Sequence, residues 1–397
     1  MADVVLAFNA GSTSLKFAAY DVDAARRPSP NVSGSVEAIQ GAPRFVVQDT
    51  AGRVLAKHEW STGNPIDHDE ALRFVVAWLQ GHLVDARLVA AGHRMMLGGP
   101  RYAGPVRIDI QVLKTLAAQS AMEPSHQPFN VRGARAVAAL LPDLPQVACF
   151  DSSFHRTMPE TARTYALPKT VRSAGIHHWG YHGLSYEYIS DRMRSLEPAA
   201  RRVIVAHLGG GSSLCAMLDG RSVETTMGFS GLSGLPMATR SGDIPPDALL
   251  YLLRSRQFDI ASLETMLYER SGLLGLSGIS GDMRVLQDST EPEAIKAVAQ
   301  FVYAMTKYAG AYAAVLGGLD ALVFTGGIGE HSHQVRSALC RQIASLGVVL
   351  DDEANRSGSA VISAPDSRVS VRVVATNEEL MIVRHTLALL DGATDGG

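Results

Sequence analysis

The chain of 397 residues is long enough for two or three domains, because a single hydrophobic core rarely extends beyond about 250–300 residues. With 46% hydrophobic and 19% charged residues, its composition is typical of a globular α/β enzyme and excludes a disordered or fibrous protein. The formal charge of −3 gives no overall attraction to nucleic acid or anionic lipid, so any binding of anions must be local.

In chain order, apolar runs bounded by turn residues predict strands, and apolar residues at helical spacing predict the helices between them. Strands are expected near residues 4–8, 15–20, 88–91, 146–150, 203–207, 213–218, 321–325 and 371–375. Helices are expected at 68–81, 110–120, 129–141, 185–195, 291–316 and 333–346, with a last one from Glu378 to about Leu390. Strands that alternate with helices indicate α/β layers.

Two of these stretches share the order strand, polar glycine-rich turn, strand. DVVLAFNAGSTSLKFAAYDVD (residues 3–23) and RRVIVAHLGGGSSLCAMLDGRS (residues 201–222) align if one residue is skipped. Because turn chemistry alone favours glycine and serine in hairpins, the likeness could arise by chance. A third stretch, DALVFTGGIGEHS (residues 320–332), adds a strand that ends in a glycine turn and is expected to open the helix from residue 333.

The common nucleotide-binding motifs are missing. The chain has no G-x-x-x-x-G-K-[ST] sequence, and no G-x-G-x-x-G opens a helix after the first strand, which excludes a P-loop and a Rossmann fold. Backbone N–H groups and hydroxyls in glycine-rich hairpin tips can still form a nest for phosphate oxygens. The three glycine-rich turns therefore predict a phosphate site of another kind.

The cysteines and the N-terminus indicate the compartment. Cys149, Cys215 and Cys340 are far apart and show neither CxxC nor Cys/His spacing, which argues against a disulfide scaffold or a cysteine zinc site. Asp3 stands where a signal peptide would be basic, and no run approaches the about 20 apolar residues of a membrane span. We expect a cytoplasmic protein with no membrane or nucleic-acid partner.

Several motifs together carry a family resemblance. FNAGSTSLKF (residues 8–17) resembles the first signature of the acetate kinase family, and the stretch from MGF to TRSGD (residues 227–243) resembles the second. Further matches are GHR (92–94), CFD (149–151), FH (154–155), GYHG (180–183), GIGE (327–330) and TNEE (376–379). They follow the family's order over nearly the whole chain, from residue 5 to residue 385.

The resemblance implies an α/β protein with two related domains of the actin-like ATPase (ribonuclease H-like) fold and an active-site cleft between them. The first domain would span residues 1–150 and be joined by a C-terminal helix at about 376–397. The second would span residues 151–375 and carry the nucleotide-binding loops. The family also implies a homodimer.

The activity implied is that of a Mg²⁺-dependent acetate kinase, a phosphotransferase with a carboxyl acceptor that converts ATP and acetate reversibly to ADP and acetyl phosphate by direct in-line transfer. Mn²⁺ is the alternative metal. A carboxylate with a pKa near ~4–5 is already ionised at neutral pH, so such a site requires charge stabilisation more than a base. A kinase for propionate, butyrate or another short-chain carboxylate is the alternative within the family. A nucleotide-binding module of the same fold without catalysis is the alternative outside it.

Four residues match catalytic positions of the family. Arg94 and Arg240 would hold the acceptor carboxylate and the γ-phosphate, since a planar guanidinium suits both anions. His182 would stabilise charge on the transferred phosphoryl group. Asp151 would orient the acceptor or arrange Arg94 and the metal.

The remaining site residues also follow from the family match. Asn9 and Glu378 match the metal positions, with Glu379 as the alternative to Glu378. The residues expected to contact the nucleotide and its phosphates are Ser12, Ser14, Lys16, His207, Leu208, Gly209, Gly210, Gly211, Asp282, Met283, Arg284, Gly327, Ile328, Gly329, Glu330 and His331.

The chain departs from the family pattern mainly around the acceptor. The family's valine, leucine, phenylalanine and proline of the acetate pocket correspond here to Met96, Ser125, Tyr181 and Gly231. One methylene discriminates substrates by only about 1–3 kcal/mol, so these changes leave the choice between acetate and other short carboxylates open. Further departures, at positions where the family has asparagine, asparagine and histidine, are Gly210, His331 and Tyr186.

Overall fold

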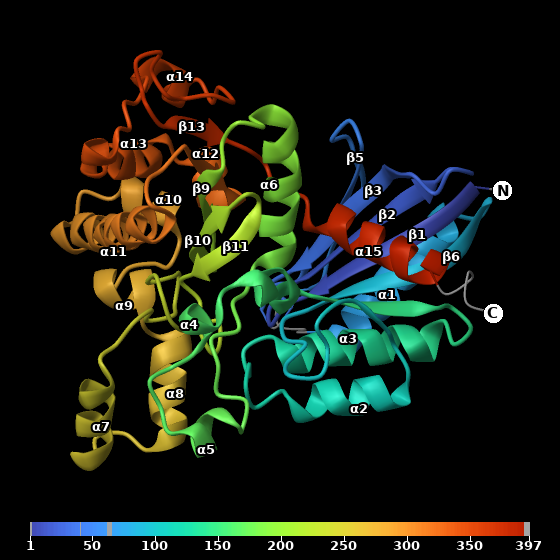
Figure 1. Ribbon diagram of the computed structural model, residues 1–397. Helices are drawn as coiled ribbons and strands as arrows, with labels where there is room; N and C mark the ends of the chain where they lie inside the picture. The colour runs from blue at the N-terminus through green and yellow to red at the C-terminus, as the bar shows by residue number, and fades with distance from the viewer. Residues whose placement is uncertain (1, 40, 62–65, 393–397) are drawn as a thin grey trace. The chain divides into compact units, whose positions relative to one another are not determined.

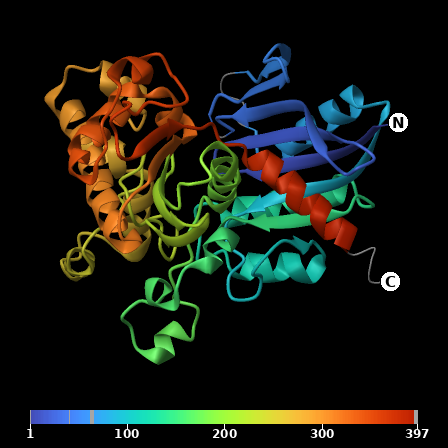
Figure 2. The same cartoon turned by 45° about the horizontal axis from the view of Figure 1, so that its top comes forward.

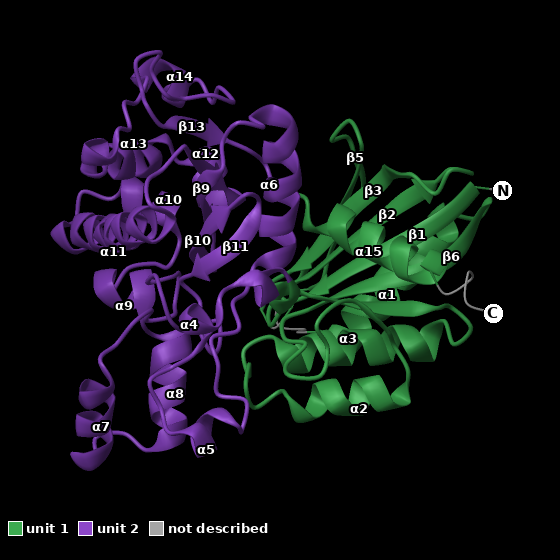
Figure 3. Cartoon of the chain, viewed as in Figure 1, with its two compact units in different colours: residues 1–153, 377–397 green, residues 154–376 purple. Residues whose placement is uncertain are grey.

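The computed structural model describes residues 2–39, 41–61 and 66–392, and the chain forms two compact units (Figure 3). Unit 1 comprises Met1–Ser153 and Asn377–Gly397, and unit 2 comprises Phe154–Thr376. Each unit is built on one mixed β-sheet with helices packed against it. The predicted α/β fold class is confirmed.

Unit 1 contains an eight-stranded sheet in the order β5-β4-β3-β2-β1-β6-β8-β7. Its elements are β1 (Ala2–Ala10), β2 (Leu15–Val22), β3 (Pro28–Glu37), β4 (Arg44–Asp49), β5 (Val54–Glu59), α1 (His68–His82), β6 (Ala86–Met95), β7 (Val106–Arg107), α2 (Ile110–Ala118), α3 (Gln127–Leu140), β8 (Gln146–Phe150) and α15 (Glu378–Gly392). The 3₁₀ helix η1 (Asp151–Thr157) follows β8 and contains the boundary to unit 2.

Both faces of the central strands in unit 1 are buried. Alternate residues of β1, from Val4 to Ala10, join a core with residues of α1 and α3. The intervening Val5 and Ala7 are buried as well. Helix α15 packs against β1, β6 and β8, and Figure 2 shows it crossing the strands of this sheet. A Cβ atom on Gly92 of β6 would lie 2.4 Å from the Ile382 side chain, so this close approach of the helix requires glycine.

Unit 2 contains a five-stranded sheet in the order β11-β10-β9-β12-β13 (Figure 1). Its elements are α4 (Glu160–Arg163), α5 (Lys169–Arg172), α6 (Gly183–Leu196), β9 (Arg202–Leu208), β10 (Ser212–Leu218), β11 (Arg221–Thr225), α7 (Pro246–Arg254), α8 (Ile260–Glu269), α9 (Gly272–Ser277), α10 (Met283–Asp288), α11 (Pro292–Leu316), β12 (Ala321–Thr325), α12 (Gly326–His331), α13 (His333–Gln342), η2 (Ala344–Leu346), α14 (Asp352–Arg356) and β13 (Ser370–Val373).

The sheet of unit 2 is covered by helices on both faces. Ile204, Ala206 and Leu208 of β9 join a core with α9, α10, α11 and α13. The alternate residues Val203 and Val205 face the opposite side and pack with α6. Successive residues of a strand point to opposite faces of the sheet, and both faces are apolar here. Each face is therefore covered by helices, which gives three layers: helix, sheet and helix.

The two sheets share one topology. In unit 1 the strands β3-β2-β1-β6-β8 are paired antiparallel, antiparallel, parallel and parallel in that order. In unit 2 the strands β11-β10-β9-β12-β13 are paired in the same way. Each sheet therefore begins with a three-stranded meander and adds two parallel strands beside its first strand. This shared order accounts for the two similar hairpins in the sequence.

All the strands and helices expected from the sequence are present, with ends that differ by a few residues. One expectation needs correction. The glycine turn after β12 does not merely precede a helix, because residues Gly326–His331 themselves form α12. The C-terminal helix begins at Glu378, as expected, and Asn377 Oδ1 accepts from Leu380 N at its start. It ends at Gly392, and residues 393–397 lie outside the described residues.

The three cysteines are buried, and none of them is in a disulfide. Burial raises the pKa of the Cys215 and Cys340 thiols to about 12, so neither forms a reactive thiolate near neutral pH. Within the described residues, no helix combines the length and the apolar composition needed to cross a membrane.

Two buried neutral histidines should make the protein less stable in acid. Burial lowers the pKa of His93 to about 4 and that of His155 to about 3. Between these values and an ordinary pKa of about 6.5, the unfolded chain binds protons that the folded chain does not, so stability falls as the pH falls. We expect a loss of at most about 1.4 kcal/mol per pH unit for each histidine.

Urea unfolding at pH 7.5, 6.5, 5.5 and 4.5 measures this slope. His93→Gln should flatten it, whereas the exposed control His82→Gln should not. An equal slope in all three proteins would show that buried histidines do not control acid stability.

Candidate active site

The tip of the β1–β2 hairpin is tied down by its own backbone and by a neighbouring helix. Gly11 N donates to Ser14 O at 2.8 Å, and Ile39 N donates to Thr13 O at 3.0 Å. His68, the first residue of α1, lies 2.7 Å from Gly11 O through Nε2. The predicted phosphate residues Ser12, Ser14 and Lys16 therefore lie on or next to an ordered turn.

Four predicted residues of unit 1 meet at the carboxyl ends of its parallel strands. Asn9 belongs to β1, Arg94 to β6, and Asp151 directly follows β8, while Glu378 opens α15. Parallel strands bring their carboxyl ends to one edge of a sheet, which explains how residues so distant in sequence come together.

Arg94 forms the centre of this group. Its Nη2 and Nε donate to Asp151 Oδ2 at 2.6 and 3.1 Å. Its Nη1 donates to Asn9 Oδ1 at 3.3 Å and lies 3.4 Å from Glu378 Oε2. Asn9 Nδ2 also donates to Glu378 Oε2, at 3.3 Å. The Asp151 side chain is fully buried and holds one edge of the guanidinium in place.

The charges of this group stabilise one another. Burial alone would lower the pKa of Arg94, but the carboxylates of Asp151 and Glu378 outweigh it and raise that pKa above its usual range. Burial and the neighbouring Glu378 carboxylate raise the pKa of Glu379, which Lys16 and Arg94 partly oppose. Arg94 is therefore a permanent cation that compensates several acidic groups.

The start of helix α3 supports the predicted acceptor residue Met96. Asn130 Oδ1 accepts from Met96 N at 3.1 Å, and Asn130 Nδ2 donates to Ala10 O at 2.6 Å. Gln127 Oε1 accepts from Leu97 N at 3.1 Å. The other predicted acceptor residue of unit 1, Ser125, lies two residues before Gln127 and donates from Oγ to the Glu123 carboxylate.

In unit 2, the glycine turn after β9 lies beside two predicted catalytic residues. A Cβ atom on Gly211 would lie 3.1 Å from His182 Nε2 and 3.4 Å from Arg240 Nη2. Ser212 Oγ accepts from Gly209 N at 3.1 Å and braces the turn. His182 has a left-handed backbone (φ 57°) at the start of α6, a conformation that costs energy for a residue other than glycine. The sequence resemblance had placed these three features in one site, and the geometry brings them together.

The segment that carries Arg240 is held at several points. Ala238 N donates to Gly210 O at 3.2 Å, which attaches the segment to the glycine turn. Arg240 Nη1 donates to Gly231 O at 2.7 Å. Asp243 accepts from Gly234 N at 2.8 Å and from the Tyr308 hydroxyl. The Arg240 side chain is thus presented by a rigid segment.

The two predicted acceptor residues of unit 2 belong to the same region. The Tyr181 hydroxyl donates to Phe229 O at 2.7 Å. Gly231 O accepts from Arg240, as described above. The hydroxyl that tyrosine adds at position 181 is therefore used to fix the segment that carries Arg240.

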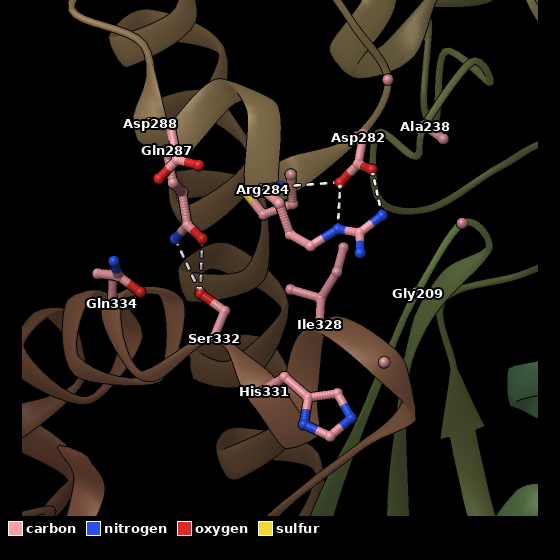
Figure 4. A pocket seen from close by; sticks show the side chains of 14 residues that line it. Gly209, Ala238, Asp282, Arg284, Gln287, Asp288, Ile328, His331, Ser332 and Gln334 are labelled. Atoms are coloured by element: carbon pink, nitrogen blue, oxygen red, sulfur yellow. Dashed lines mark hydrogen bonds and ion pairs between the residues drawn. The ribbon is translucent and has the colours of Figure 1, made fainter.

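A cavity of about 780 Å³ adjoins the glycine turns of unit 2 (Figure 4). Its size suits a nucleotide. Predicted nucleotide residues that line it are Gly209, Gly210, Asp282, Met283, Arg284, Gly327, Ile328 and His331. Lining residues that the sequence did not indicate are Ala238, Gly281, Gln287, Asp288, Ser332 and Gln334.

Figure 4 shows two polar pairs at this cavity. Arg284 forms a two-pronged ion pair with Asp282, at 2.6 and 3.1 Å. Gln287 Nε2 donates to Ser332 Oγ at 2.8 Å and joins α10 to the start of α13.

Among the predicted nucleotide residues of unit 2 that do not line the cavity, Glu330 holds the glycine turn after β12 in place. Glu330 Oε1 accepts from Gly326 N at 2.9 Å and from Thr376 N at 3.3 Å. Buried Arg336 donates to the carbonyls of Gly329 and Glu330 at 2.9 Å. The structure places His207, Leu208, Gly211, Gly329 and Glu330 in the two glycine turns or directly beside them.

The two units share one strand order, and unit 2 has a nucleotide-sized cavity at the glycine turn that lies beside Arg240 and His182. Together these features define a kinase of the actin-like ATPase fold. A family model described as the acetokinase family matches residues 4–384. The chain belongs to this family and is a phosphotransferase that acts on a carboxyl group.

Individual proteins agree with this assignment. An acetate kinase of Rhodopseudomonas palustris is 45% identical over 99% of this chain and 100% of its own length. A propionate kinase from Francisella tularensis has a TM-score of 0.87 at 32% identity, covering 96% of this chain and 98% of that structure. The acetate kinase of Porphyromonas gingivalis has a TM-score of 0.84 at 32% identity, covering 98% and 100%.

Proposed function

We propose that this protein is an acetate kinase that transfers the γ-phosphoryl group of ATP to acetate in the presence of Mg²⁺ and also catalyses the reverse reaction. A carboxylate oxygen forms a bond to the γ-phosphorus, the bond from this phosphorus to the bridging oxygen breaks, and ADP leaves with the electron pair. Acetyl phosphate is the other product. Because the acceptor is already ionised, no group has to remove a proton.

The observation that carries the proposal is the position of His182 Nε2 and Arg240 Nη2, which both lie at Gly211. The cavity next to this turn would hold the nucleotide, with its phosphates at the glycine turns of β9 and β12. His182 and Arg240 would then face the phosphoryl group and stabilise the charge on its oxygens during transfer.

In unit 1, Arg94 would bind the acceptor carboxylate or the transferred phosphoryl group, since its Nη1 is directed away from Asp151. The hydrogen bonds from Arg94 to Asp151 favour the role in which Asp151 positions the arginine.

The activity is tested with MgATP, hydroxylamine and a series of acceptors: acetate, propionate, butyrate and lactate. Acyl phosphates react with hydroxylamine to give coloured hydroxamates. We expect product with acetate at a higher kcat/KM than with the other acids. Absence of product with every acid, at saturating ATP, would contradict the proposal.

Propionate is a second candidate acceptor. One reason is the structural match to a propionate kinase. The other is that the acceptor positions, Met96 and Ser125 among them, differ from the residues that acetate kinases usually have there. The same acceptor series decides, because a change of one methylene corresponds to only about 1–3 kcal/mol in transition-state binding.

We propose Asn9 and Glu378 as the residues that would hold a magnesium ion. Each has a side-chain oxygen, Asn9 Oδ1 and Glu378 Oε2, both of which contact Arg94 Nη1 in this structure, and Mg²⁺ prefers oxygen ligands while keeping several waters. Among the described residues, no cluster of three or more His, Cys, Asp and Glu side chains forms a ready metal site. When bound, the ion would neutralise phosphate charge.

Glu378→Gln should therefore raise the Mg²⁺ concentration needed for half-maximal activity by about 10-fold or more, since one anionic ligand is lost. EDTA should abolish activity, and Mn²⁺ should replace Mg²⁺. Glu353→Gln, at an exposed carboxylate of α14, is the control. An unchanged Mg²⁺ requirement in Glu378→Gln would exclude this glutamate as a ligand.

We also propose a homodimer formed through helix α7. This helix has the sequence PDALLYLLR, yet it has no buried residue, and Leu250 and Tyr251 are 54% and 63% exposed. An apolar helix without cover is typical of a surface that packs against a second copy.

The double variant Leu250→Glu/Tyr251→Glu should sediment as a monomer at micromolar concentration. The parent protein and Val84→Glu, at an exposed valine of unit 1, should sediment as dimers. A parent protein that is monomeric, or a double variant that stays dimeric, would disprove this interface.

Three buried cysteines without a disulfide support a cytoplasmic location, which we propose for this enzyme.

A further inference from the structure

A buried serine connects two side chains of unit 2 behind the glycine turn. Ser213, the second residue of β10, is fully buried, as is Tyr186 of α6. Ser213 Oγ lies 2.9 Å from His182 Nδ1 and 2.5 Å from the Tyr186 hydroxyl. The three groups form one continuous line of hydrogen bonds.

This line determines how the His182 ring is oriented. With Nδ1 held by Ser213, the opposite nitrogen Nε2 faces Gly211 and Arg240. The ring also packs on His207, with centroids 4.2 Å apart and an angle of 30° between the planes. His207 is itself held through Nδ1, which lies 2.8 Å from Ser185 Oγ.

The hydrogen-bonding capacity of the three groups favours one direction of the line. A buried tyrosine hydroxyl is costly unless it donates its hydrogen. If Tyr186 donates to Ser213, the serine hydrogen is free to be donated to His182 Nδ1. Neutral His182 then carries its hydrogen on Nε2, the nitrogen that faces the glycine turn. The opposite tautomer would present a lone pair to a phosphate oxygen.

We propose that Ser213 and Tyr186 are positioning residues that keep His182 oriented with Nε2–H as the donor to the transferred phosphoryl group. This inference rests on the function proposed above and adds a requirement on residues that touch no substrate. Ser213 is suited to the role because it lies in a buried strand, where its side chain cannot turn away.

The test compares serine variants by steady-state kinetics with MgATP and acetate. Ser213→Ala should lower kcat by about 10-fold, while KM for ATP and for acetate stays within about twofold, because orientation in the transition state is lost and not substrate binding. Ser213→Thr retains the hydroxyl and should restore kcat to within about threefold of the parent.

A second buried serine serves as a matched control. Ser222 Oγ lies 2.8 Å from His155 Nδ1, and the other nitrogen of that ring is 2.9 Å from Tyr181 O. Ser222→Ala therefore removes the same kind of bond from a histidine that does not face the glycine turn. It should leave kcat within about twofold, even if its unfolding temperature falls as much as that of Ser213→Ala.

A double-mutant cycle separates positioning from general damage. In a His182→Asn background, Ser213→Ala should cause no further decrease in kcat, because the ring it positions is absent. Tyr186→Phe should lower kcat by about threefold in the parent and have no effect in that background.

The outcomes are distinguishable. If the parent protein forms no acyl phosphate, the proposed function is wrong, and this inference falls with it. If the parent is active but Ser213→Ala has normal kcat, or multiplies the loss caused by His182→Asn, only the positioning role is wrong.

Discussion

Replacing Arg94 with methionine is expected to lower kcat/KM for acetyl phosphate formation by at least about 10³-fold, as is typical when a preorganised cation or donor is removed. It should also lower the free energy of unfolding by about 3–5 kcal/mol, because the fully buried Asp151 carboxylate loses its cation. Hydroxamate assays and urea unfolding measure the two effects.

The chain provides a matched control for this variant. Arg87 lies on the same strand β6 and forms a two-pronged pair with Asp3, with both bonds at 2.7 Å. That arginine is exposed, so Arg87→Met should cost no more than about 1 kcal/mol and leave activity unchanged. Normal activity in Arg94→Met would refute its role in the site, whatever the stability.

Arg240→Gln should show the opposite balance, a loss of activity with little loss of stability. Its side chain makes a hydrogen bond to Gly231 O, whereas the segment that carries it is held through backbone bonds and through Asp243. We expect kcat to fall by about 10²–10³-fold and the unfolding free energy to change by less than about 1 kcal/mol.

The control is Arg172→Gln, which also removes a guanidinium that donates to a carbonyl, that of Leu167, at 2.9 Å. Arg172 lies on the exposed helix α5 and should affect neither quantity. If Arg240→Gln retained full activity, the grouping of His182 and Arg240 at Gly211 would have no role in phosphoryl transfer.

Strands and helices with strong apolar patterns could be predicted from the sequence, and weakly patterned ones could not. The predicted strands at the centre of each sheet are buried on both faces, which makes them continuous apolar runs. Strand β3 has two prolines and only two buried residues, and β5 has no buried residue. Such strands form because the adjacent strand has backbone N–H and C=O groups available for pairing, and the local sequence does not encode this.

The candidate site shows the same division. Glycine turns and charged residues such as Arg94 could be found by resemblance, because they lie in recognisable motifs. Their supports could not, since Asn130 and Ser213 are ordinary polar residues until the fold buries them beside Met96 and His182. Their supporting role can be recognised only when the structure shows that the polar side chain is buried and which group it bonds. Cavity-lining residues such as Gln287 are likewise brought in by tertiary packing alone.

The discontinuous course of unit 1 has a consequence for how the protein is made. Helix α15 covers β1, β6 and β8 and supplies Glu378, but it follows all of unit 2 in the sequence and is therefore synthesised after that unit. Unit 2 is continuous in sequence, whereas the strands of unit 1 are made before unit 2 and must wait for a helix that is made after it. Only a polypeptide that extends past unit 2 and includes α15 can therefore bring Asn9, Arg94, Asp151 and Glu378 together, and a chain whose translation stops within unit 2 cannot acquire the site.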